Sequence, residues 1–112
     1  MLNDTLELNR AFAALADPIR RGMLARLSEG PASVSELAAP LPISLPAVLQ
    51  HLKALEASGL VASEKRGRIR TVRVRPETLG AVETWLTRRR REWEAHLDRF
   101  EDYLLTLQQE ED

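Results

Sequence analysis

The stretch SLPAVLQHLKALEASGLV, residues 44–61, decides the fold that we expect for this chain. Ser44 is a favoured N-cap, and Pro46 falls inside the first helical turn, where its missing backbone N–H costs no hydrogen bond. Gly59 supplies the left-handed residue with which many helices end. The stretch therefore predicts a short helix with a defined beginning and a defined end.

The phase of this helix separates a buried face from an exposed one. Val48, Leu52 and Leu55 recur at helical spacing and predict the stripe that packs on neighbouring helices. The other side chains suit DNA, because Gln hydrogen-bonds adenine, Lys neutralises phosphate and an apolar edge contacts a thymine methyl group. His51 lies toward the edge of the buried face, so we favour packing or a phosphate contact over a pH switch. The DNA-binding residues predicted here are Ser44, Leu45, Pro46, Leu49, Gln50, His51 and Lys53.

Three more helices are predicted before this one. Apolar spacing predicts a helix over about 4–16, with Leu8, Phe12 and Leu15 on one stripe. Asp17 and Pro18 then begin a second helix, which carries a buried stripe of Ile19, Met23 and Leu27. The sequence SVSE, residues 33–36, is a capping box that begins a short third helix, and the prolines of APLP, residues 39–42, end it.

After Gly59 the pattern changes from helical to extended. Val72 and Val74 alternate with polar residues as along a strand with one buried face, and Gly67 marks a tight turn. We therefore expect a two-stranded wing, whose long basic side chains reach a minor groove or flanking phosphates in preference to serving only the solubility of an exposed edge. The basic residues near its tip are Lys65, Arg66, Arg68 and Arg70.

The charge of the chain is segregated, although its sum is only −1. Residues 44–75 carry seven basic and two acidic side chains, whereas residues 76–112 carry five basic and ten acidic ones. A local positive region on a balanced chain favours a site for a polyanion.

From Pro76 the apolar residues step by three and four, which predicts one long helix over about 77–108. At about 1.5 Å per residue this helix is about 48 Å long, too long for so small a domain to cover. A second copy of the chain is the commonest source of such a surface. The predicted dimer interface consists of Leu8, Phe12, Leu79, Val82, Leu86, Trp93, Leu97, Phe100 and Leu104.

Two features of the long helix admit functional interpretations. Four arginines, residues 88–91, project all round it. The favoured interpretation is that they pair with Glu83, Glu92, Glu94 or a glutamate of a partner chain. The alternative is that Arg89, which interrupts the apolar seam, binds an anionic effector. His96 and Glu92 share a face, but two ligands in each subunit make a poor zinc site, so we expect no metal.

Several functional classes have no support in the sequence. The chain has no cysteine, which excludes disulfides, thiolate metal sites and cysteine nucleophiles. We find no Gly-rich phosphate loop and no nucleophile elbow, so we expect neither an enzyme nor a cofactor. An apolar run of about 20 residues is also missing, which predicts a cytoplasmic protein without a membrane partner.

The elements together predict one domain over residues 1–112, mainly α-helical with a small β-hairpin. This is a winged helix-turn-helix, with a DNA-binding core over residues 4–75 and a C-terminal dimerisation helix over residues 76–109. The segments ALADPIRRGMLARL, SVSELA, SLPAVLQHLKALEASGLV and GRIRTVRV, which begin at residues 14, 33, 44 and 67, resemble the ArsR family of bacterial transcriptional regulators.

The resemblance implies a homodimer whose fourth helix enters the major groove and whose wings contact the flanks. It also implies repression that ends when a signal, such as a small-molecule effector, arrives. Metal-sensing members use a cysteine pair in the third helix, or His and carboxylate ligands on the terminal helix. Ser35 cannot replace a thiolate in the third helix. Leu49 replaces the small polar residue common in the family. We therefore expect a regulator that is not a classical metal sensor, with a winged-helix protein-interaction module that binds no DNA as the alternative.

Overall fold

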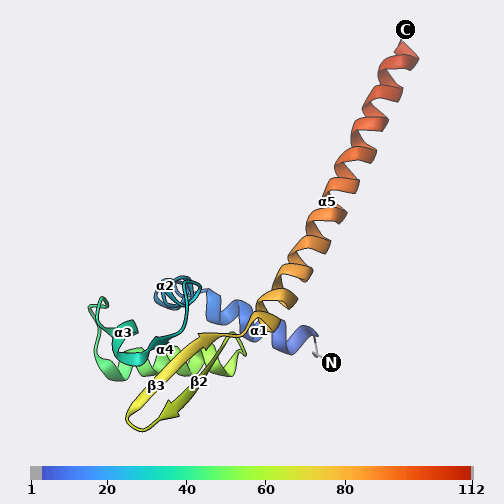
Figure 1. Ribbon diagram of the computed structural model, residues 1–112. Helices are drawn as coiled ribbons and strands as arrows, with labels where there is room; N and C mark the ends of the chain where they lie inside the picture. Colours follow the sequence, from blue (N-terminus) through green and yellow to red (C-terminus); the bar gives the residue numbers. More distant parts are fainter. Residues whose placement is uncertain (1–3, 112) are drawn as a thin grey trace. The chain divides into compact units, whose positions relative to one another are not determined.

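The computed structural model describes residues 4–111 and contains helices with a small sheet among them (Figure 1). Four helices come first along the chain, and a hairpin and one long helix follow them. In chain order the elements are α1 (Asp4–Leu15), α2 (Pro18–Leu27), β1 (Ala32–Ser33), α3 (Val34–Ala38), α4 (Leu45–Ala57), β2 (Val61–Arg66), β3 (Ile69–Val74) and α5 (Pro76–Glu111). The predicted class, mainly α with a hairpin and a long C-terminal helix, is confirmed.

Local capping chemistry fixes where the helices begin and end. The Asp17 carboxylate accepts the backbone N–H groups of Ile19 and Arg20, which caps α2. Ser33 and Glu36 form the predicted capping box at the start of α3. Gly59 follows α4 with φ +80°, in the left-handed region. The helix boundaries predicted from these residues are confirmed to within a residue or two.

The sheet has three antiparallel strands in the order β1-β3-β2, where the sequence predicted a two-stranded wing. Ala32 pairs with Val72 and Ser33 with Thr71, so β1 adds a short third strand at the base of the hairpin. The predicted hairpin of β2 and β3 is confirmed, whereas β1 was not predicted, because a two-residue strand has no periodicity of its own and exists only through its partner.

The hydrophobic core is built from α2, α3, α4 and the base of the sheet. The predicted stripe of α4 is confirmed, since Val48, Leu52 and Leu55 are all buried. In α1 the most buried side chains are Ala11 and Ala14, while those of the predicted stripe are only partly covered. Small side chains on this face allow α1 to approach α4 closely.

The chain divides into two compact units, the first ending at Ala81 and the second beginning at Val82. Leu79, at the start of α5, packs on the core of the first unit. The second unit is the remainder of a single helix of 36 residues, about 54 Å long at about 1.5 Å per residue. Among residues 4–111, no helix combines the length and the apolar character that a membrane span needs.

Candidate nucleic-acid interface

Helix α4 begins with a cap that presents its first residues to solvent. Ser44 has extended backbone angles, and its Oγ accepts the N–H of Ala47 at 3.3 Å. Pro46 lies within the first turn, as expected, and has no N–H to satisfy. Leu45 is 54 % exposed just inside the cap. The first turn of α4 is therefore capped, helical and exposed to solvent.

The exposed face of α4 carries the predicted base- and phosphate-contacting groups. Gln50 and Lys53 are exposed, and Leu49, which flanks them, is 45 % exposed. Within residues 4–111 the side chains of Gln50 and Lys53 make no hydrogen bond or ion pair. Their polar groups are therefore available to an external partner, while the buried stripe behind them holds the helix in place.

His51 lies apart from this face and contacts α2. Its Nδ1 lies 3.3 Å from Arg20 Nη1 and 3.9 Å from Asp17 Oδ1, and its side chain is largely buried. The expectation that His51 packs at the edge of the core agrees with this position. Sequence alone did not indicate these partners, because Arg20 and Asp17 lie more than 30 residues away along the chain.

The register of the wing places its basic residues on two different faces. Ser63 pairs with Val72 and Lys65 with Arg70, so all four side chains share the face that Val72 buries against the core. Arg66 pairs with Ile69 on the opposite face. Arg68 lies in the turn beside Gly67, which has φ +62°. The four predicted cations therefore do not form one surface.

Two of these arginines already have partners within the chain. Arg70 Nη1 donates to Ser63 Oγ at 2.8 Å, and the Ser63 hydroxyl donates to the Glu56 carboxylate on α4. Arg66 Nε lies 3.3 Å from Glu64 Oε1, as an exposed pair. Lys65 and Arg68 make no hydrogen bond or ion pair within the described part of the chain. Arg70 thus joins the wing to α4, whereas Lys65 and Arg68 are free to meet phosphate.

A shallow cavity of about 320 Å³ lies between α4 and the wing. Its walls mix apolar and charged groups, and Lys53, Glu56 and Arg70 are the charged members. The cavity brings a predicted contact of the helix and a predicted contact of the wing to one place.

One exposed residue of the wing was not predicted as a contact. Ile69 is 61 % exposed among the wing cations. The strand alternation contained the signal, because an odd-numbered position opposite in phase to Val72 must face solvent. An exposed β-branched side chain of this kind suits an apolar contact with DNA sugars or base edges.

Two carboxylates at the beginnings of helices have pKa values below their ordinary values. The backbone N–H of Arg20 is the largest cause that lowers the pKa of Asp17 below its ordinary 3.8, and the backbone N–H of Ile19 and the charge of Arg20 add to it. The backbone N–H and hydroxyl of Ser33 likewise lower the pKa of Glu36 below 4.5, and Arg26 adds to the effect. Both charges stabilise the N-termini of α2 and α3.

The residues predicted for the dimer interface fall into two groups. Leu79 and Val82 are covered within the single chain, and Leu8 is half-buried. Phe12 is 37 % exposed. The remaining members lie along α5 with their side chains mainly exposed, and they are Leu86, Trp93, Leu97, Phe100 and Leu104.

Two of the four arginines in the basic run of α5 are paired within their own helix. Arg89 Nη2 lies 3.1 Å from Glu92 Oε1, and its guanidinium also stacks over Trp85. Arg90 Nε lies 3.8 Å from Glu94 Oε1. The favoured interpretation of this run, intrahelical pairing, is confirmed for these two arginines, and effector binding by Arg89 stays a prediction.

His96 and Glu92, the two possible metal ligands of α5, each contact an arginine instead of each other. His96 Nδ1 lies 2.6 Å from Arg99 Nη2, while Glu92 is held by Arg89. Within the described range 4–111, no three His, Cys, Asp or Glu side chains gather in a way that could hold a metal ion.

The sequence of the chain is similar to those of known proteins. Residues 15–64 match the model of a helix-turn-helix domain family. Over 80 residues the chain is 46 % identical to the HTH-type transcriptional regulator Rv2034 of Mycobacterium tuberculosis, covering 71 % of this chain and 75 % of that protein. Over 62 residues it is 44 % identical to the transcriptional repressor SmtB of the same species, covering 55 % of this chain and 44 % of the repressor.

A solved structure extends the similarity to the fold. The crystal structure of an ArsR family transcriptional regulator superposes with a TM-score of 0.75 at 49 % identity. The match covers 79 % of this chain and 91 % of that one. The superposed region is therefore longer than the helix-turn-helix segment of residues 15–64.

Proposed function

The chain belongs to the ArsR family of transcriptional regulators, and from this premise we propose that it binds an inverted-repeat operator as a homodimer and represses transcription until a signal releases it. The family relation makes it a DNA-binding transcriptional regulator. The dimeric state, the operator symmetry, the direction of regulation and the contacting residues are the content of the proposal.

The exposed face of α4 carries the proposal. Gln50 and Lys53 point to solvent without partners in the described chain, on a helix whose other face is locked into the core. Gln50 reads a base edge in the major groove, and Lys53 binds a backbone phosphate. Leu45 and Leu49 offer apolar surface for thymine methyl groups. Ser44 and Pro46 hold the end of α4 that enters the groove.

The wing supplies contacts that do not depend on sequence. Lys65 and Arg68 are exposed and unengaged, so each can neutralise a phosphate. Arg66 and Arg70 contribute positive potential, although each must leave or share its internal partner to contact DNA directly. In this arrangement α4 selects the site and the wing adds affinity to any duplex.

A second copy of the chain provides the symmetry. Trp93, Leu97, Phe100 and Leu104 form an apolar stripe at spacings of four, three and four along α5, and all four are exposed. Exposed apolar surface of this length is rare on monomers and typical of interfaces. A two-fold dimer presents two copies of α4, which predicts half-sites about 10 or 20 base pairs apart.

Repression and release follow the relation to SmtB, which is named a repressor. The releasing signal acts on the dimer rather than on the reading face, and Arg89 is our candidate for binding an anionic small-molecule effector. Its guanidinium must exchange Glu92 for that ligand.

A gel shift and a footprint on DNA from upstream of the gene test the proposal. We expect specific binding, protection of two half-sites related by symmetry, and a logarithmic salt slope of about −0.9 for each phosphate neutralised. Absence of a shift at low salt would favour the alternative function, a protein-interaction module. The observation behind that alternative is the exposed apolar pair Leu45 and Leu49.

A further inference from the structure

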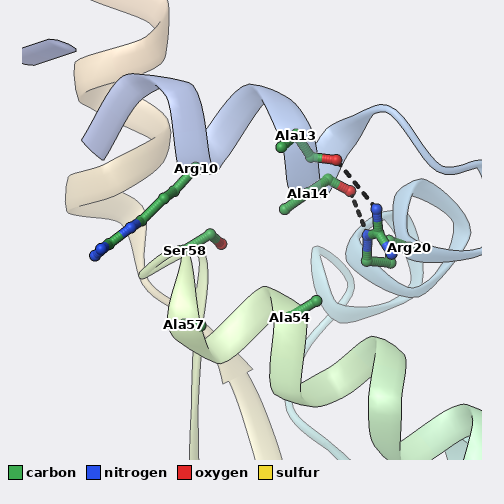
Figure 2. Close-up of a pocket in the computed structure, with 7 residues that line it drawn as sticks. All are labelled: Arg10, Ala13, Ala14, Arg20, Ala54, Ala57 and Ser58. Atoms are coloured by element: carbon green, nitrogen blue, oxygen red, sulfur yellow. Dashed lines mark hydrogen bonds between the residues drawn. The ribbon is translucent and has the colours of Figure 1, made fainter. Parts of the chain in front are cut away.

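Arg20 joins three helices through one guanidinium group. Its Nε donates to Ala14 O at 2.7 Å and its Nη2 to Ala13 O at 3.0 Å, so it satisfies carbonyl groups at the end of α1 (Figure 2). Its Nη1 lies 3.3 Å from Nδ1 of His51 on α4. Arg20 itself stands in the first turn of α2, where Asp17 accepts its backbone N–H. Two of the three guanidinium nitrogens therefore contact α1, and the third contacts α4.

A hydrogen bond at this contact is possible with only one neutral tautomer of His51. An arginine guanidinium has donors and no acceptor, so Nδ1 of His51 must be the acceptor. A neutral imidazole that accepts at Nδ1 carries its proton at Nε2. Asp17 Oδ1 lies 3.9 Å from Nδ1, which is too far for a hydrogen bond that would hold a proton there.

The second nitrogen of His51 is open to an external acceptor. Within residues 4–111 Nε2 has no hydrogen-bond partner, and it is not among the buried polar atoms that are left without one. The side chain is about one-fifth exposed. His51 therefore offers one N–H donor to solvent from the helix that carries Gln50, the adjacent residue.

We propose that Arg20 is a positioning residue for DNA binding, which holds His51 in its Nε2–H tautomer so that this N–H donates to a backbone phosphate oxygen. The inference rests on the proposed function. The contact is a neutral donor, and it therefore adds affinity without releasing a counterion. It also sets the rotation of α4 about its axis, because His51 is tied to α2 and, through Arg20, to α1.

The tautomer is tested on the full-length protein without DNA. The chain has two histidines, so His96→Gln leaves the imidazole of His51 alone in a ¹⁵N NMR spectrum. At an alkaline pH where the imidazole is neutral, we expect an unprotonated Nδ1 and a protonated Nε2. Arg20→Lys, which keeps the charge but loses the fork of donors, should shift Nδ1 toward the value of an unbound imidazole. A protonated Nδ1 in the parent protein would overturn the assignment.

The contact itself is tested by a matched pair of substitutions at His51. Glutamine places an N–H near the position of Nε2. Asparagine keeps an acceptor near Nδ1, but its shorter side chain places no N–H at the position of Nε2. We expect His51→Asn to weaken operator binding about tenfold, as for loss of a hydrogen bond to a charged group, and His51→Gln to stay within about threefold of the parent. The salt slope should be unchanged in both.

The remaining outcomes discriminate between explanations. Equal losses in His51→Asn and His51→Gln, with unchanged unfolding midpoints, would overturn the donor role. A salt slope lowered by about one in His51→Asn would mean that His51 binds phosphate as a cation, which also contradicts the proposal. If the parent protein binds no DNA, the proposed function and the phosphate contact fail together, while the NMR experiment still decides whether Arg20 fixes the tautomer.

Discussion

Arg70 is turned toward Ser63 on the neighbouring strand, and the 2.8 Å hydrogen bond from its Nη1 to Ser63 Oγ continues to Glu56 on α4. The two residues share a face because Lys65 and Ser63 pair with Arg70 and Val72 in the same antiparallel register. A side chain that looks like a phosphate anchor in the sequence is therefore also a link between the wing and the recognition helix. Arg68, two residues earlier, has no such link.

Arg68→Ala and Arg70→Ala should separate these two roles. We expect Arg68→Ala to weaken binding to specific and unrelated duplexes alike, to lower the salt slope by about 0.9, and to change the free energy of unfolding by less than about 0.5 kcal/mol. Arg70→Ala should lower the free energy of unfolding by about 1 kcal/mol, because it removes a charge-assisted hydrogen bond. Salt titrations of binding and urea unfolding measure both. Identical behaviour of the two variants would contradict the division.

Gln50→Ala should affect selectivity more than general affinity. The exposed amide is the group best suited to read a base, so its loss should cost about 1–3 kcal/mol on the operator and relax the preference at one position. Lys53→Ala is the matched comparison on the same face, and its effect should be equal on all sequences. Binding to a library with each operator position varied makes the measurement. A uniform loss with Gln50→Ala would mean that Gln50 contacts the backbone.

Leu97→Glu should convert the dimer to a monomer. The side chain lies within the exposed apolar stripe of α5, and a buried, unpaired carboxylate at a dimer interface costs several kcal/mol. Ala95→Glu adds the same charge about 160° away around the helix, at about 100° per residue, and should leave the dimer intact. Sedimentation velocity over a range of concentrations distinguishes the two. A parent protein that stays monomeric at high concentration would exclude the dimer interface.

Gly59→Ala should destabilise the fold through two separable effects. The residue has φ +80°, and a Cβ at this position would lie 2.9 Å from Thr78 Oγ1. The left-handed backbone alone costs an L-residue about 1–2 kcal/mol. Combining it with Thr78→Ala, after correction for the effect of Thr78→Ala alone, should recover the steric part and leave the backbone part. Chemical denaturation of the three variants measures this, and complete recovery in the double variant would contradict a backbone cost.

Acid should destabilise the protein partly through Asp17 and Glu36. Their pKa values are lower in the folded state than in the unfolded state, so their contribution to stability is complete above the ordinary values of 3.8 and 4.5. It is lost as the pH falls through the lowered folded values, because the unfolded state then binds more protons. Asp17→Asn retains a capping side chain but not the charge, and it should flatten the dependence of the unfolding midpoint on pH below about 4.5.

Much of the site was predictable because its signals are local. The outward face of α4 follows from helical phase once Ser44 and Gly59 mark the ends, and Gln50 and Lys53 lie where that phase puts them. The wing cations were predicted as a group, but their division into two faces depends on strand register. Ile69 was not predicted as a contact, although strand alternation relative to Val72 places its side chain on the exposed face.

The sequence by itself determined the helices, their caps, the buried stripe of α4 and the hairpin turn. Each of these depends on hydrogen bonds and side-chain spacing within a few residues, which the order of amino acids specifies directly. Only the tertiary structure decided that β1 pairs with β3, that Arg70 turns toward Ser63 and Glu56, and that Arg20 meets His51 across 31 positions of the chain. Those contacts join segments distant in sequence, and they form only after the core has brought the segments together.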